Sequence, residues 1–173
     1  MIRAAAVLAA AALLGGCATR GPAADEETAW AAGRLSVRVE ATADRAAQSL
    51  GAAFELRGSG ERGELRLNSP LGTQMAAARW APGLARLTTA DGATEFASLD
   101  DLSRRTLGEV LPLVALPDWL AGRPWPGAPH RPEAAGFEQL GWQVSLARRA
   151  EGWVEARREA PPAVTVRVRL DEH

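Results

Sequence analysis

The sequence of 173 residues has few of the residue types from which most active sites are built. Of its two histidines, His130 lies in a stretch rich in proline and glycine, and His173 ends the chain, so neither has the setting of a buried general base. The sequence contains no metal-protease, nucleophile-elbow, P-loop or dinucleotide-binding motif. The acidic pair Asp100-Asp101 fits the first turn of a helix, where the helix dipole favours negative charge. We therefore expect a protein that is not an enzyme and that holds no metal and no free cofactor.

Lysine and tyrosine are also missing, and all 20 basic residues are arginine, which we attribute to the base composition of the genome. The formal net charge of -1 gives no sign of a nucleic-acid-binding protein. Hydrophobic residues make up 47% of the chain and charged residues 24%, proportions that are typical of folded globular proteins. The length allows one domain with a substantial core.

The sequence has no long apolar run, since the apolar stretch near its start covers only residues 4–14. A helix needs about 20 residues to cross a membrane, so this stretch, with Arg3 before it, predicts a secretory signal peptide instead. The stretch ends in Leu14-Gly15-Gly16-Cys17, which resembles the lipobox of bacterial lipoproteins. This resemblance implies cleavage of residues 1–16 and a covalent lipid on Cys17. An incidental cysteine after an ordinary signal peptide is the alternative, but a lone free thiol is a liability in an oxidising compartment.

Residues 17–28 are small, polar and acidic, which predicts a flexible tether between the lipid and a single domain over residues 29–173. In Gram-negative lipoproteins, an aspartate after the lipidated cysteine favours retention in the inner membrane. Because Ala18 holds that position here, the lipobox resemblance implies an outer-membrane lipoprotein that faces the periplasm.

Alternating apolar and polar residues predict a mainly β domain. The strands expected from this pattern cover residues 34–39, 50–56, 65–67, 73–80, 84–89, 94–97, 139–146, 153–158 and 164–170. Ser98 and Asp101 form a capping box for a helix that ends near Gly108, and a short second helix is expected over residues 117–121. The proline- and glycine-rich residues 122–136 are expected to form a loop. Strands with one apolar face favour a curved antiparallel sheet or barrel, with the helices covering the apolar side.

Five short motifs, in this order, carry a resemblance to a known family. They are Trp30-x-x-Gly33-Arg34-Leu35-x-Val37, Asn68-Ser69-Pro70-Leu71-Gly72, Leu107-Gly108-x-x-Leu111-Pro112-Leu113, Trp119-Leu120-x-Gly122-x-Pro124 and Gly141-Trp142-x-Val144. Together with the lipobox they resemble the LolB family, the outer-membrane lipoprotein receptors. The family implies a half-open antiparallel β-barrel with a helical lid over an apolar cavity, which agrees with the strand and helix pattern.

The resemblance also implies a function. Receptors of this family accept acylated lipoproteins from the periplasmic carrier LolA and insert them into the inner leaflet of the outer membrane. The partners implied here are thus LolA, the lipoprotein cargo and that leaflet, and we expect the receptor to act as a monomer. Two departures from the family pattern stand out: Ser145-Leu146 lies where an aromatic residue is expected, and residues 73–80 are rich in alanine.

The residues expected on the inner face of the strands and helices are candidates for lining the cavity, although each could equally be ordinary core. From the strands these are Leu35, Val37, Val39, Phe54, Leu56, Leu65, Leu67 and Met75, and from the helical part Leu102, Leu111, Leu113 and Trp119.

Pro70, Leu71 and Gly72 form a predicted turn, and a leucine at a turn tip is unusual because such tips are normally polar. In the family, the matching leucine lies on a protruding loop that helps to deliver lipoproteins to the membrane. The alternative is a leucine that folds back onto the barrel rim.

Two other functions stay open from the residues alone. One is a lipid-anchored scaffold protein of the envelope that binds partners through its sheet edges and holds no acyl chain. The other is an envelope hydrolase, which would need a polar cluster inside the cavity.

Overall fold

The computed structural model describes residues 31–171. The predicted signal peptide, Cys17 and the tether 17–28 therefore lie outside the described residues, and only the domain is open to structural comparison. Within the described range, no helix combines the length and the apolar character needed to cross a membrane.

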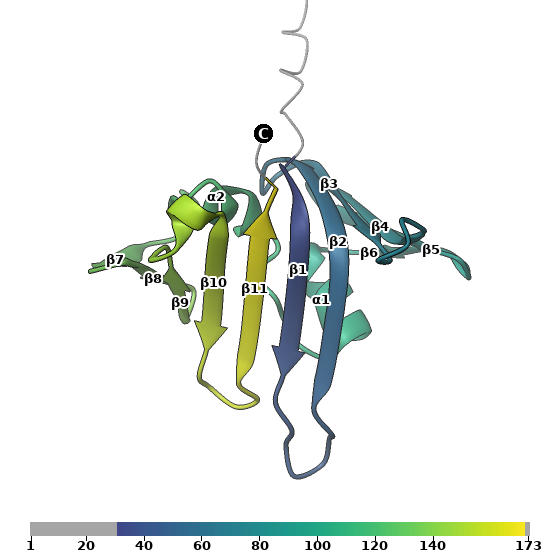
Figure 1. Ribbon diagram of the computed structural model, residues 1–173. Helices are drawn as coiled ribbons and strands as arrows, with labels where there is room; N and C mark the ends of the chain where they lie inside the picture. The colour runs from purple at the N-terminus through teal and green to yellow at the C-terminus, as the bar shows by residue number, and fades with distance from the viewer. Residues whose placement is uncertain (1–30, 172–173) are drawn as a thin grey trace, which may run out of the picture.

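The domain is built on a single antiparallel sheet of eleven strands, in the order β6-β5-β4-β3-β2-β1-β11-β10-β9-β8-β7 (Figure 1). The strands are β1 (Ala31–Val39), β2 (Gln48–Gly58), β3 (Gly63–Asn68), β4 (Gln74–Ala81), β5 (Leu84–Thr89), β6 (Gly92–Phe96), β7 (His130–Glu133), β8 (Gly136–Gln139), β9 (Trp142–Ser145), β10 (Trp153–Arg158) and β11 (Val164–Leu170). The first and last strands along the chain, β1 and β11, pair in the middle of the sheet. The sheet does not close, so β6 and β7 remain as its two edges.

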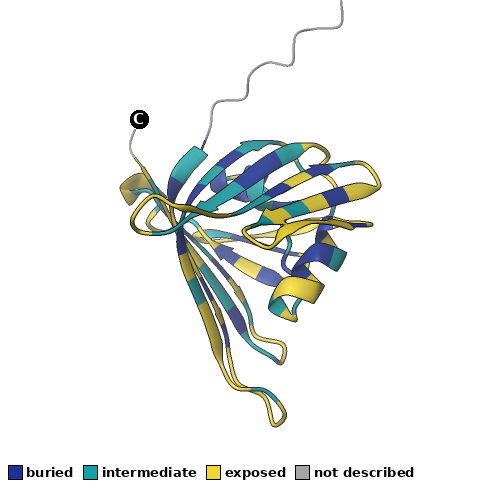
Figure 2. Ribbon diagram, turned by 90° about the vertical axis from the view of Figure 1, so that its right-hand side faces the viewer, coloured by how far each residue is buried: buried dark blue, intermediate teal, exposed yellow. Residues whose placement is uncertain are grey.

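The sheet is strongly curved, and the helices α1 (Leu99–Leu107) and α2 (Leu116–Leu120) lie on its inner side (Figure 2). Strand β1 shows how sequence sets the two faces, since Val37 and Val39 are buried while Arg34, Ser36 and Arg38 are exposed. This alternation follows from the two-residue period of a strand. The mainly β fold with few helices confirms the predicted fold class, and the open sheet agrees with an incomplete barrel.

Helix α1 begins and ends where its sequence predicts. The hydroxyl of Ser98 accepts a hydrogen bond from the N–H of Asp101 at 3.1 Å, which satisfies one free donor of the first turn. Gly108 ends the helix in the left-handed conformation with a φ of 72°, which glycine adopts without steric cost. Leu99 and Leu102 face the sheet and are buried, so the helix is held by its apolar side.

Two predictions for the second half of the chain were wrong. The segment 122–136 is not entirely loop, because it contains β7, an edge strand whose four residues are all exposed. Its sequence, His-Arg-Pro-Glu, has no apolar alternation and includes a proline, so periodicity could not reveal it. The predicted single strand 139–146 is broken at its start, because Leu140 and Gly141, with φ values of 56° and 77°, form the turn between β8 and β9. Leucine rarely adopts a positive φ, so only Gly141 marked this turn in the sequence.

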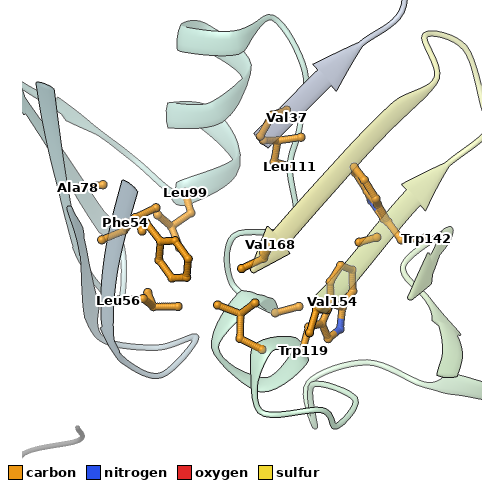
Figure 3. Close-up of a cluster of buried hydrophobic side chains, with 14 of the residues drawn as sticks. Val37, Phe54, Leu56, Ala78, Leu99, Leu111, Trp119, Trp142, Val154 and Val168 are labelled. Atoms are coloured by element: carbon orange, nitrogen blue, oxygen red, sulfur yellow. The ribbon is translucent and has the colours of Figure 1, made fainter. Parts of the chain in front are cut away.

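The buried core lies between the inner face of the sheet and the two helices. Figure 3 shows one part of it, in which Phe54 and Leu56 of β2 lie near Leu99 of α1. Trp119 of α2 and Trp142 of β9 lie together on the other side of this view, with ring centroids 6.4 Å apart. Packing is thus dense at both sides of the concave face, and the space left between them forms the site described next.

Candidate functional site

An apolar pocket of about 370 Å³ lies between the concave face of the sheet and the helices. Its volume falls within the range of small-molecule sites. Strands β1 to β5 and β9 to β11 form one wall, and α1, α2 and the connection between them form the other. Among the described residues that line it, none carries a charge.

The few polar side chains in the pocket wall are occupied by the backbone. The Ser103 hydroxyl donates to the Asp100 carbonyl at 3.2 Å and accepts from the Leu111 N–H at 3.2 Å. The Thr106 hydroxyl donates to the Leu102 carbonyl at 2.8 Å. Because these groups are already paired, the wall presents hydrocarbon to any occupant. Such a surface favours binding of an aliphatic group by removing it from water, and it offers little for acid–base chemistry.

The exposed part of the pocket wall comes from the start of β4 and from the last turn of α1. Met75 and Thr106 are the two exposed residues of its wall, and Met75 keeps 38% of its surface accessible. The pairing of β3 and β4 shifts at this point, because Leu67 pairs with Ala76 whereas Asn68 pairs with Gln74. Met75 is therefore the extra residue of a β-bulge, and bulges re-aim a side chain at the rim of a curved sheet.

Nine of the twelve residues proposed to line a cavity come together in this pocket. They are Leu35, Val37, Leu65, Leu67, Met75, Leu102, Leu111, Leu113 and Trp119. The other three, Val39, Phe54 and Leu56, are buried but lie outside its wall. They point to the same side of the sheet, yet neighbouring side chains fill the space in front of them, as Leu99 does near Phe54 (Figure 3).

The pocket wall also contains residues that the sequence analysis did not single out. They include Leu50, Leu87, Leu107, Leu116, Trp142, Val166 and Val168. Leu50, Val166 and Val168 belong to alternating patterns already visible in the sequence, and Trp142 belongs to one of the five motifs. Periodicity shows which face of a strand is buried, but it cannot show which part of that face stays unfilled by the helices.

Leu71 lies at the tip of the β3–β4 turn and is 94% exposed, the largest exposed fraction among the large hydrophobic residues described. The turn is well formed, since the Ser69 carbonyl accepts from the Gly72 N–H at 2.9 Å and the Ser69 N–H donates to the Thr73 carbonyl at 2.8 Å. Gly72 has a φ of 83°, which suits glycine. A leucine held outward by an ordered turn has not folded back onto the rim, and it lies four residues before Met75 at the pocket mouth.

Trp119 is held in the pocket wall by Gln139 of β8, whose side chain is fully buried. The Gln139 side-chain carbonyl accepts from the indole N–H of Trp119 at 2.8 Å and from the backbone N–H of Trp125 at 2.9 Å. The Gln139 amide donates to the carbonyls of Trp125 and Ala128, both at 2.8 Å. One side chain thus fixes helix α2 and the loop after it to the sheet. No local pattern in the sequence predicts this role for Gln139.

An ion cluster holds the end of α1 at the other side of the pocket. Glu109 accepts from Arg158 of β10 at 2.8 Å and from Arg45, in the β1–β2 connection, at 3.5 Å. Arg45 also donates to the carbonyl of Gly108 at 3.3 Å. These bonds join the residues that follow α1 to β10 and to the β1–β2 connection, which are far from α1 in the sequence.

No cluster suited to metal binding exists in the described part of the chain, where no three His, Cys, Asp or Glu side chains converge. His130 is exposed and packs edge-on against Phe137, away from the pocket.

Comparison with known proteins gives a consistent result. The family model described as outer membrane lipoprotein LolB matches residues 28–171. Outer-membrane lipoprotein LolB of Bordetella petrii is 36% identical over 148 residues, which cover 79% of this chain and 74% of the relative. The protein of the same name from Chromobacterium violaceum is 35% identical over 156 residues, covering 87% and 86%, and that from Halorhodospira halophila is 31% identical, covering 86% and 79%. From its match to the family model and its identity to these relatives, we conclude that the chain belongs to the LolB family of outer-membrane lipoproteins.

Proposed function

We propose that this protein accepts acylated lipoproteins from the periplasmic carrier LolA and inserts them into the inner leaflet of the outer membrane. The observation that carries the proposal is the apolar pocket, which opens at Met75 beside the exposed Leu71. The pocket offers a place for an acyl chain away from water, and Leu71 offers a contact with the bilayer.

The solvation of acyl chains explains why a protein is needed for this step. At ~0.8 kcal/mol per CH₂, one sixteen-carbon chain exposed to water costs on the order of 12 kcal/mol, and a mature lipoprotein carries about three such chains. A wall of aliphatic side chains replaces that water. We propose that transfer runs downhill without ATP, from weaker apolar binding in the carrier to stronger binding here, and then into the bilayer.

In this proposal the curved sheet acts as a half-open barrel, and α1 with α2 acts as its helical lid. The pairing of Glu109 with Arg158 and Arg45 would hold the lid at one side, and the Gln139 bonds would hold it at the other. The mouth would lie at Met75 and Thr106, the two exposed residues of the pocket wall. Acyl chains would enter and leave there.

The expected anchor completes the arrangement. We propose that residues 1–16 are removed as a signal peptide, that Cys17 carries the lipid, and that residues 17–28 tether the domain, which works as a monomer. We also propose that the role is not catalytic, since the wall offers hydrocarbon and backbone-paired hydroxyls.

The rival scaffold function would use the free edges of the sheet. Edge strand β7 carries Pro132 between Arg131 and Glu133, and Arg131 pairs with Glu133 and with Glu138 of the neighbouring strand β8. Charges and proline on an edge strand hinder the addition of another strand. This edge therefore favours the receptor over the scaffold.

The proposal is tested by transfer of cargo in solution. The chain from residue 17 onward, with Cys17→Ala, is mixed without ATP with LolA loaded with a radiolabelled lipoprotein, and the two proteins are then separated. We expect the label to move to this chain. Label that stays on a carrier proven competent with its own cognate receptor would refute the receptor function.

A further inference from the structure

The outer face of the central strands carries a dense group of arginines. Along β1 it presents Arg34, Ser36 and Arg38, and along β11 it presents Arg169, Arg167 and Thr165 in direct register with them. Strand β10 adds Trp153, Glu155 and Arg157, again in register. Figure 1 looks onto this face, with α1 behind the sheet. We call this surface the arginine face, after its five arginines Arg34, Arg38, Arg157, Arg167 and Arg169.

Charge is not balanced on the arginine face. Glu40 pairs with Arg38 at 2.7 Å and Glu155 pairs with Arg167 at 2.6 Å, so five arginines face two glutamates. Within the described residues, Arg34, Arg157 and Arg169 form no salt bridge, although the charges of Glu40 and Glu151 act on Arg157 and Arg169 from a longer distance. Moreover, Arg34 and Arg169 are direct cross-strand partners. Like charges placed directly opposite each other disfavour pairing in a sheet.

The arginine face is also wide and uncovered. The outward residues of the neighbouring strand β2 are small, with Ala53, Gly51 and Ser49 opposite Arg34, Ser36 and Arg38. A shallow hollow lies over Ser36, Gly51 and Thr165 as a result. At the start of β10, the guanidinium groups of Arg148 and Arg169 lie over the Trp153 ring, 5.3 and 5.8 Å from its centroid. Three strands give a surface about 10 Å wide and about 13 Å long, enough for several headgroups.

We propose that the arginine face is a docking surface for the anionic phospholipid headgroups of the membrane that holds this protein. The family places the chain at the outer membrane, and the expected anchor at Cys17 lies fourteen residues before Ala31, where β1 begins. That spacing keeps the start of β1 within about 50 Å of the bilayer. Arginine near an anionic surface and tryptophan at a headgroup layer are both favoured there. A flat, wide surface on which arginines outnumber carboxylates suits a layer of phosphates better than one peptide.

Docking in this way would orient the domain. The pocket lies on the opposite side of the same sheet, so the mouth at Met75 and Thr106 would face away from the membrane. This second statement rests on the proposed function, whereas the docking itself does not. A receptor that lies on its outer face would present its mouth to a carrier in the periplasm, and it would have to release the arginine face before the Leu71 turn could deliver cargo to the bilayer.

The test uses vesicles and no cargo. The chain from residue 17 onward with Cys17→Ala retains every described strand and helix, and it is sedimented with vesicles of phosphatidylcholine alone or of phosphatidylcholine with phosphatidylglycerol. We expect binding to the anionic vesicles only, weakened by salt. The triple variant Arg34→Gln, Arg157→Gln and Arg169→Gln should bind on the order of 100-fold more weakly, at roughly fivefold per arginine. The matched control, Arg62→Gln, Arg104→Gln and Arg105→Gln, removes the same charge from exposed positions elsewhere and should bind as the parent does.

Three results would overturn the proposal: no binding to anionic vesicles, equal losses in both triple variants, or undiminished binding of the arginine-face variant. If that variant binds vesicles normally but receives less cargo from LolA, the face serves a protein partner and membrane docking is wrong. Conversely, loss of vesicle binding with unchanged cargo transfer supports docking and leaves the receptor function intact.

Discussion

Leu71 illustrates how one exposed residue can carry a separate step of a transport function. Its side chain is 94% exposed on a turn that two backbone hydrogen bonds hold in shape, and it makes no part of the pocket wall. Changing it should therefore leave folding and the pocket untouched.

We predict that Leu71→Glu folds, accepts cargo from LolA and fails to insert it into liposomes, because a carboxylate is costly to place in hydrocarbon. Radiolabel transferred to sedimented liposomes measures the last step. Leu84→Glu, at another exposed leucine that begins strand β5, is the control and should insert cargo normally. Efficient insertion by Leu71→Glu would show that the leucine has no part in delivery.

Gln139 is the opposite case, a buried polar residue with a purely positioning role. Gln139→Leu has similar volume but leaves the indole N–H of Trp119 and the backbone N–H of Trp125 without their acceptor. Buried donors without partners cost about 1–3 kcal/mol each, so we predict a loss of roughly 3 kcal/mol in the free energy of unfolding. Urea unfolding measures it, with Gln143→Leu at an exposed position of β9 as control. A loss no greater than that of the control would mean that Gln139 does not hold the lid.

At the scale of elements, β2, β3 and β4 are tied together on their outer face by Glu64. Its carboxylate, only 4% exposed, accepts hydrogen bonds from Arg57, Arg66 and Arg79 at 2.8, 2.9 and 3.1 Å. Burial raises the pKa of Glu64, but the hydrogen bonds from the three arginines outweigh it and lower the pKa from 4.5 to about 2. The folded state thus holds this carboxylate in its charged form.

Because the folded pKa lies below the unfolded value, Glu64 stabilises the domain above about pH 4.5, and this contribution is lost as the pH falls towards 2. A shift of this size corresponds to about 3 kcal/mol at neutral pH. We predict that Glu64→Gln loses roughly that much at pH 7 and shows a weaker decline in stability between pH 5 and 2 than the parent. Urea unfolding across this range measures both, and Glu95→Gln, at an exposed site, should change neither. Parallel pH profiles of parent and Glu64→Gln would contradict the assignment.

The elements also show what sequence alone could supply. The strands at residues 84–89, 153–158 and 164–170 were predicted with their bounds right or nearly so, because each has a clear alternation, and α1 was marked by Ser98 and Gly108. The edge strand β7 and the turn at Leu140 were missed, since β7 has no apolar alternation and Gly141 alone marked the turn. The unfilled part of the concave face and the bonds of Gln139 depend on contacts between distant segments, which no local pattern encodes.

At the scale of the whole molecule, the open sheet produces two surfaces with different chemistry. The concave side, covered by α1 and α2, keeps an uncharged pocket, whereas the outer side of the central strands collects arginine. The mouth of the pocket and the Leu71 turn lie at the same end of β4, so one region of the chain both opens the pocket and reaches outward. The central claim is that an acyl chain of the cargo lies in this pocket.

Site-specific photo-crosslinking tests that claim most directly. A photoreactive residue is placed at Leu87, in the pocket wall, or at Thr88, on the opposite face of the same strand, and each protein is loaded from LolA with a lipoprotein radiolabelled in its acyl chains. Light should attach the label at position 87 and not at position 88. Equal labelling at both positions, or labelling at position 88 alone, would contradict the account, because the acyl chains would then bind outside the pocket.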